Sequence, residues 1–115
     1  MSVRELTESE QVVLLALVGL MARADGSVSE PEMDVLDELR DGIGPERFAG
    51  VRDAAAGYDG AEAILQAAAK IERAEARDTI FQILVAMAAP DSIAENEAEL
   101  FRRLGKLWGL DASFA

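Results

Sequence analysis

The run from Val12 to Ala22 constrains the fold more than any other part of the sequence. It contains apolar residues and one glycine, with no charge, so a helix over it is apolar on every side. Such a helix is stable only where other elements cover it all round, which predicts a central, buried helix. The run is too short to cross a bilayer, which takes about 20 apolar residues.

Capping patterns mark where this helix and others begin. Thr7 with Glu10, Ser29 with Glu32, and Asp59 with Glu62 each place an acid three residues after an N-cap residue, the pattern of a capping box. Together with Gly and Pro breaks they predict helices over about 8–24, 30–41, 45–55, 60–71, 77–89 and 95–108. The polar stretch 71–78 leaves open whether the fourth helix breaks there or continues into the fifth.

No window reads as a strand, because sustained period-2 alternation and Asn-Gly hairpin signals are missing. The prediction is an all-α bundle of about six or seven helices. A length of 115 residues fits one domain, 1–115. Trp108, one turn beyond Leu104 on the apolar face of the last helix, is expected in the core.

The charge of the chain limits the kinds of partner that it can bind. It has 22 acidic and 11 basic residues and a formal net charge of −11. Such a surface repels phosphate backbones and anionic headgroups, so we expect neither nucleic-acid binding nor membrane insertion. Cations and basic protein surfaces are the favoured partners. A homodimer is a further option, because Arg102, Arg103 and Lys106 could pair with the acids of a second copy.

Cysteine and histidine are both missing from the sequence. This excludes a disulfide framework, a Cys/His zinc site and a His-based catalytic triad. Oxygen atoms alone could hold a metal, which points to Ca²⁺, Mg²⁺ or Mn²⁺. The polar N-terminus does not resemble a signal peptide, so the expected location is the cytoplasm. No catalytic pattern is present, and we expect no enzymatic activity.

Two segments of the chain match each other, Leu17 to Leu39 and Ile83 to Leu104. Each has an apolar helix, an acidic turn with one β-branched residue, and a second helix with Glu in its first turn and spaced leucines. Such self-similarity predicts two helical hairpins related by a pseudo-two-fold axis. The copies are unequal, since Pro90-Asp91 stands where the first copy has Asp25-Gly26.

The pattern A-D-G-x-[IV]-x-x-x-E, present as Ala24, Asp25, Gly26, Val28 and Glu32, resembles the tellurite-resistance TerB-like family. The degenerate second copy, ending in 107–110, strengthens the resemblance, which covers about residues 10–110. It implies an all-helical bundle with two acidic turns near each other and a suspected divalent-metal site. It also implies association with stress-response systems that include tellurite resistance.

The candidate metal ligands are Asp25, Glu32, Asp91 and Glu97, with Ser27 or backbone carbonyls completing an oxygen shell. The alternative is local structure alone. Asp25-Gly26 is then only a turn, and Glu32 only completes a capping box. The second turn departs from the pattern of the first, which argues against a symmetric site. The first turn is therefore expected to supply the main ligands.

Two more specific sequence motifs do not match these residues. Counted from Asp25, an EF-hand loop would need Gly and Glu where Glu30 and Leu36 stand. Asp91-Ser92-Ile93 echoes the modification site of acyl-carrier proteins, but too little chain follows it to complete that fold. Two hypotheses remain. One is a non-enzymatic interaction or stress-response module with a divalent cation, and the other is a metal-free acidic adaptor for a basic protein.

Overall fold

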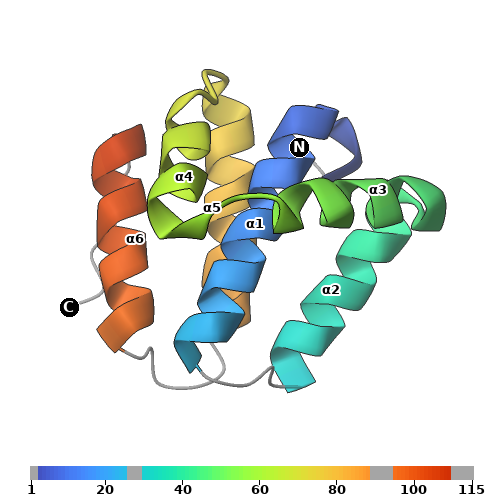
Figure 1. The fold of residues 1–115 in the computed structure, drawn as a ribbon, viewed down its shortest axis with the longest axis horizontal. Coiled ribbons are helices and arrows are strands. Elements are labelled where there is room, and N and C mark those ends of the chain that lie inside the picture. Colours follow the sequence, from blue (N-terminus) through green and yellow to red (C-terminus); the bar gives the residue numbers. More distant parts are fainter. Residues whose placement is uncertain (1–2, 26–29, 89–94, 110–115) are drawn as a thin grey trace.

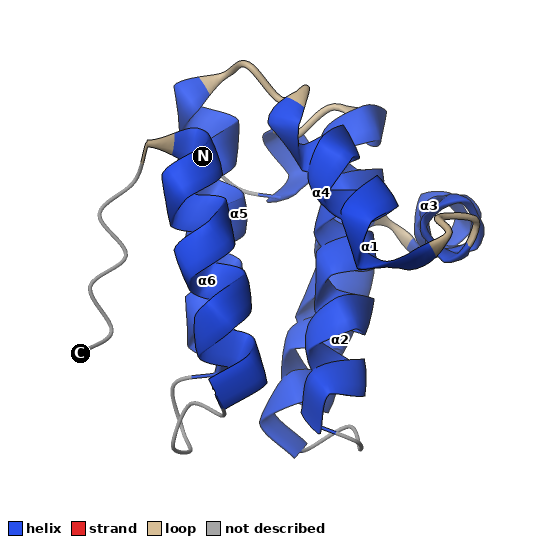
Figure 2. Ribbon diagram, turned by 60° about the vertical axis from the view of Figure 1, so that its left-hand side comes forward, coloured by secondary structure: helices blue, strands red, loops and turns tan. Residues whose placement is uncertain are grey.

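The computed structural model describes residues 3–25, 30–88 and 95–109, with the side chains of 22–25, 30–33, 35, 87–88 and 95–98 left out. In these ranges the chain forms one 3₁₀ helix and six α-helices and no strand (Figures 1 and 2). The elements are η1 (Val3–Glu5), α1 (Glu8–Asp25), α2 (Glu30–Ile43), α3 (Pro45–Ala56), α4 (Gly60–Ala69), α5 (Ala74–Ala88) and α6 (Glu95–Trp108). The prediction of an all-α helical bundle is confirmed.

Helix α1 lies at the centre of the bundle, as its apolar sequence predicts. It contacts α3, α4, α5 and α6, and Figure 1 shows α3 running at a steep angle to it. Leu14 and Leu17 are fully buried, and the residues between them are nearly so. The apolar run therefore forms the core that the other helices cover.

The two similar segments form α1–α2 and α5–α6, and they contact each other crosswise. Helix α1 packs against α6, and α2 packs against α5. Exchanging the two units maps one of these contacts onto the other, so the arrangement fits a pseudo-two-fold relation. The C-terminal ends of α1 and α5 and the N-terminal ends of α2 and α6 all lie at the same end of the bundle (Figures 1 and 2).

Of the three predicted capping boxes, the one at Thr7 is confirmed. The Glu10 N–H donates to Thr7 Oγ1 at 3.2 Å, and the Thr7 N–H donates to Glu10 Oε1 at 2.7 Å. Two backbone donors at the start of α1 are thus satisfied by side chains. The capping box predicted at Ser29 lies outside the described residues.

The capping box predicted at Asp59 is wrong. Asp59 precedes α4, but its side chain makes no capping hydrogen bond. Glu62 instead accepts a hydrogen bond from Arg103 of α6. Gly60 begins the helix with φ of +89°, a conformation that a residue with a side chain rarely adopts. Glu62 thus has a partner that is distant in sequence, and its local capping role is absent.

The helix breaks in the polar stretch 71–78, where the sequence allowed either a break or a continuous helix. Helix α4 ends at Ala69, and α5 begins at Ala74, three residues before the predicted start. Ile71 is 6% exposed and anchors the turn in the core. Its carbonyl accepts a hydrogen bond from Arg77 Nε at 2.6 Å.

Helix α6 closes the bundle against α4 and α5. The Phe81 and Phe101 rings meet edge to face, with centroids 5.6 Å apart. Trp108 is buried as predicted, and its Nε1 donates to the Ala68 carbonyl at 2.9 Å. Gly109 follows with φ of +68°, the left-handed conformation that commonly ends a helix.

Candidate functional site

The predicted metal ligands belong to the end of the bundle where the two acidic turns connect the helices. Asp25 is the last residue of α1, while Glu32 and Glu97 stand in the first turns of α2 and α6. The side chains of these three residues, and Asp91 altogether, lie outside the described residues. The backbone thus brings three of the four positions to one end of the bundle.

Elsewhere, the described side chains form no group of three or more acids that could hold a metal ion. No helix in the described ranges is long and apolar enough to cross a membrane.

A second set of polar residues gathers at the opposite end, where α1 begins. Arg73, in the turn between α4 and α5, donates to both carboxylate oxygens of Glu10, through Nε at 3.0 Å and through NH2. The same NH2 group lies 3.3 Å from the Glu5 carbonyl oxygen. Arg73 therefore joins the N-terminal segment and α1 to the turn that precedes α5.

These contacts set the charge state of Glu10. The Arg73 guanidinium is the largest influence, and it lowers the pKa of the Glu10 carboxyl below its usual value. The Thr7 N–H lowers it further, while burial opposes both by disfavouring the charged form. Glu10 is 6% exposed, so it is a buried carboxylate whose charge is matched by one arginine.

The N-terminal segment is tied down at two further points. Gln11 Nε2 donates to the Val3 carbonyl at 2.9 Å, and Arg4 Nε donates to the Gly42 carbonyl at 3.3 Å. Gly42 permits this close approach, because a Cβ at its position would stand 2.6 Å from Val3 Cγ1. Helix α2 and the segment before α1 therefore meet so closely that a side chain at position 42 would require Val3 to shift.

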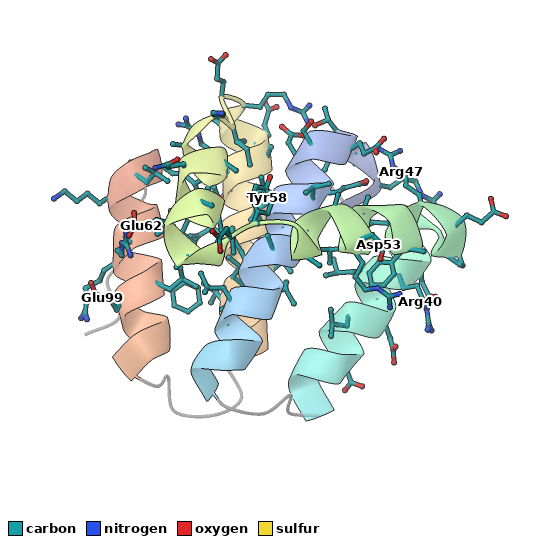
Figure 3. The ribbon with its side chains drawn as sticks, in the orientation of Figure 1. Arg40, Arg47, Asp53, Tyr58, Glu62 and Glu99 are labelled. Carbon is teal, nitrogen blue, oxygen red and sulfur yellow. The ribbon has the colours of Figure 1, made fainter. Side chains whose placement is uncertain are left out.

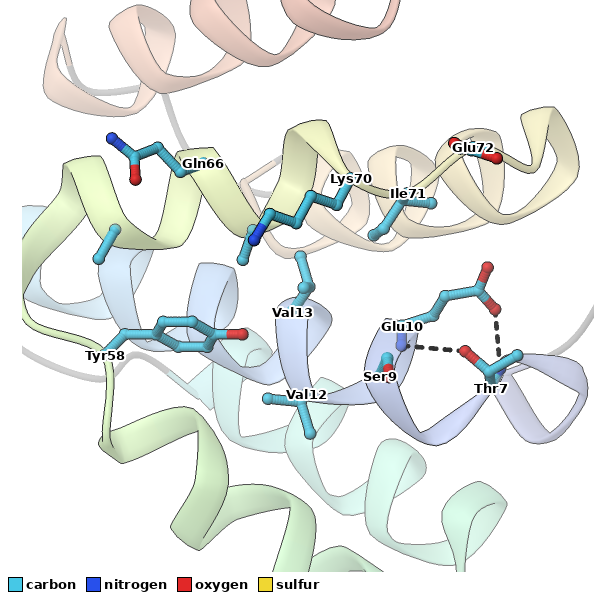
Figure 4. A pocket seen from close by; sticks show the side chains of 12 residues that line it. Thr7, Ser9, Glu10, Val12, Val13, Tyr58, Gln66, Lys70, Ile71 and Glu72 are labelled. Atoms are coloured by element: carbon cyan, nitrogen blue, oxygen red, sulfur yellow. Dashed lines mark hydrogen bonds between the residues drawn. The ribbon is translucent and has the colours of Figure 1, made fainter.

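An open pocket of about 670 Å³ lies beside this cluster, between α1 and α4 (Figure 4). Its volume falls within the range of about 300–1,000 Å³ that is common for small-molecule sites. Apolar side chains from α1 and α4 and Ile71 form its floor, and polar side chains stand around them. The lining residues are Thr7, Ser9, Glu10, Val12, Val13, Tyr58, Ala63, Gln66, Ala67, Lys70, Ile71 and Glu72.

The fold fits what the sequence pattern predicted for a family of helical bundles, and a family model tests that interpretation directly. The model described as "Tellurite resistance protein TerB" matches residues 11–114. The chain belongs to the TerB family. The match spans both acidic turns and every α-helix except the first residues of α1.

No curated protein and no solved structure gives a significant match to the chain. Family membership therefore rests on the TerB family model together with the helical architecture.

The sequence did not predict the Glu10–Arg73 link or the pocket. The Thr7–Glu10 spacing gave a local capping role, which is correct, but an arginine 63 residues away carries no pattern that names its partner. Tyr58 is half-buried against the core, with its ring on the pocket wall.

Proposed function

We propose that this TerB-family chain is a non-enzymatic interaction module of a stress-response system, and that a divalent cation binds between its acidic turns. The observation that carries the proposal is the gathering of four helix ends at one end of the bundle (Figure 1). Two of those helices carry an acid in their first turn, and α1 ends on Asp25.

The chemistry of these helix ends supports a cation. The last carbonyls of a helix lack intrahelical partners, and the C-terminal end of a helix carries partial negative charge. The ends of α1 and α5 are therefore a source of neutral oxygen ligands beside the carboxylates. Ca²⁺, Mg²⁺ and Mn²⁺ prefer such oxygen shells. Asp25 and Glu32 are the proposed main ligands, with Asp91 and Glu97 assisting.

The net charge of −11 supports a basic protein as the partner. Opposite charge accelerates association with a basic surface and disfavours nucleic acids. A cation bound between the turns would link the ends of α1 and α2 to those of α5 and α6. The surface offered to the partner would then depend on the cation.

Thermal unfolding in Ca²⁺, Mg²⁺ or Mn²⁺, each compared with EDTA at matched ionic strength, tests the proposal. A ligand that binds only the folded chain stabilises it by about 2.7 kcal/mol at a concentration 100 times Kd. We expect at least one of the three cations to raise the Tm. If none does so at millimolar concentration, the cation site is wrong and the metal-free adaptor is favoured.

Charge-matched variants locate the site. Asp25→Asn and Glu32→Gln should abolish the cation-dependent rise in Tm. Glu46→Gln is the control for Glu32, because Glu46 is an exposed acid in the first turn of another helix, α3. Asp53→Asn is the control for Asp25, since Asp53 lies on α3, away from the four helix ends (Figure 3). A rise in Tm that survives both site variants would place the cation elsewhere.

A further inference from the structure

The pocket between α1 and α4 has an apolar floor and a polar wall. Val13 and Ile71 are buried beneath it, and Val12, Ala63 and Ala67 are partly exposed toward it. Because the pocket is open, the exposed parts of Val12, Ala63 and Ala67 are in contact with water. Their shielding by an aliphatic group would be favourable in proportion to the area covered.

Three groups that can donate hydrogen bonds line the same pocket. Figure 4 shows the Tyr58 hydroxyl directed into it and the Lys70 side chain extending over it, with the Gln66 amide on the α4 side. No hydrogen bond or ion pair within the described residues engages the Lys70 ammonium, the Gln66 amide or the Tyr58 hydroxyl. These donors remain available to a ligand.

Some of the charged groups around the pocket are paired within the described part of the chain and others are not. Glu10 lies on its wall, but Arg73 and the Thr7 N–H engage its carboxylate oxygens. Glu72 lies near Ile71, at the end of the pocket away from Tyr58 (Figure 4). Between them, the Lys70 ammonium forms no ion pair with a carboxylate of the described residues. The middle of the pocket therefore favours an anion beside an apolar surface.

From this geometry we infer that the pocket binds a small aliphatic monocarboxylate. The carboxylate accepts hydrogen bonds from Lys70 and Tyr58, and the hydrocarbon lies over Val12, Val13 and Ala67. A charge-assisted hydrogen bond fixes the polar end, and burial of apolar surface holds the other. The inference goes beyond the proposed interaction role and does not depend on a cation at the acidic turns.

The net charge of the chain makes the test sharp. A surface with a charge of −11 attracts cationic amphiphiles and repels anionic ones. Nonspecific adsorption would therefore favour octylammonium over octanoate. A preference for octanoate can arise only from a local arrangement of donors that overcomes the general field.

The experiment titrates the ¹⁵N-labelled full chain with octanoate, octan-1-ol and octylammonium, each below its aggregation concentration, and follows the backbone amide shifts. Octanoate is expected to bind most tightly, with shifts concentrated at Val12, Val13, Ala63 and Ala67. Equal or tighter binding of octan-1-ol or octylammonium would overturn the inference, as would octanoate shifts spread evenly over the molecule.

Lys70→Met removes the ammonium and keeps an apolar stem of similar length. Because the site is exposed to solvent, we expect octanoate affinity to fall by about threefold or more. Lys106→Met is the matched control, since it removes the same charge from the exposed face of α6, outside the pocket. Equal losses in the two variants would show that only net charge matters and would contradict the assignment.

Ala63→Glu provides an independent check. Ala63 lines the pocket from α4, about two helical turns before Lys70, so the new carboxylate would add a negative charge to the pocket wall and repel octanoate. We expect octanoate shifts to disappear while the far-UV circular dichroism stays helical. Retained octanoate affinity in a folded Ala63→Glu chain would count against the pocket.

Discussion

Glu10 shows how one residue serves two scales of structure. Its spacing from Thr7 makes it the N3 residue of a capping box, which is a local role. Its carboxylate also holds Arg73, which belongs to a turn between two other helices. A buried carboxylate without a cation would be costly, so the arginine makes the capping position tolerable.

The lowered pKa of Glu10 predicts how stability responds to pH. Because Arg73 holds the folded-state pKa of the Glu10 carboxyl below its ordinary value, the ionised pair stabilises the fold above that ordinary value. This contribution is lost as the pH falls through the folded-state pKa. We therefore expect Glu10→Gln to lower the urea midpoint clearly at about pH 7 and progressively less below about pH 4.

Urea unfolding of wild type and Glu10→Gln at each pH measures this difference. Glu8→Gln, in the same turn and exposed, controls for the loss of one negative charge. If the difference in urea midpoint between wild type and Glu10→Gln stays constant or widens on acidification, the stabilising role of the Glu10–Arg73 pair is refuted.

At the scale of elements, two similar capping patterns fold differently. Thr7 with Glu10 forms its capping box, whereas Asp59 with Glu62 does not. In the second case Glu62 pairs with Arg103, 41 residues away, across α4 and α6, and Gly60 begins α4 with a φ of +89°. Helix existence and approximate ends follow from local sequence, but the choice between a cap and a long-range partner depends on how helices pack.

The two candidate sites differ in the same way: one depends on local sequence and the other on how helices pack. The acidic turns could be found from sequence, because their residues are close in the chain and repeated. The pocket could not, since its walls come from α1, α4 and Tyr58, and only the packing of α4 along α1 brings them together. An exposed lysine at the end of a helix has no sequence feature that separates it from an ordinary surface lysine.

The contact between η1 and α2 gives a prediction about Gly42. Alanine is favoured over glycine in a helix by up to about 1 kcal/mol, yet its Cβ would stand 2.6 Å from Val3 Cγ1. We expect Gly42→Ala alone to destabilise the chain by about 1 kcal/mol, because the crowded segment must shift. In a Val3→Ala background the same substitution should become stabilising.

A double-mutant cycle by urea unfolding measures this coupling. Ala-for-Gly substitution at Gly50, which is on α3 and meets no atom within 4 Å of an added Cβ, is the control. It should stabilise the chain whether or not Val3 is truncated. An effect of Gly42→Ala that has the same sign in both backgrounds would show that the close approach does not limit this position.

For the whole molecule, size and charge together predict a response to salt. The radius of gyration is 12.9 Å and the longest extent 38 Å, while the Debye length falls from about 30 Å at 0.01 M salt to about 3 Å at 1 M. At low salt the 22 acids therefore repel one another across much of the bundle. Unfolding separates those charges, so self-repulsion destabilises the compact state.

We accordingly expect NaCl to raise the Tm steadily from about 0.01 M to about 0.5 M, through screening alone. Removing surface acids should shrink this rise, so the double variant Glu46→Gln and Asp53→Asn should have a higher Tm at low salt and a shallower salt dependence. A variant of unchanged net charge, Arg52→Lys, should leave the slope as it is. A Tm that stays flat or falls with NaCl would mean that favourable ion pairs, such as Glu10–Arg73 and Glu62–Arg103, outweigh the repulsion.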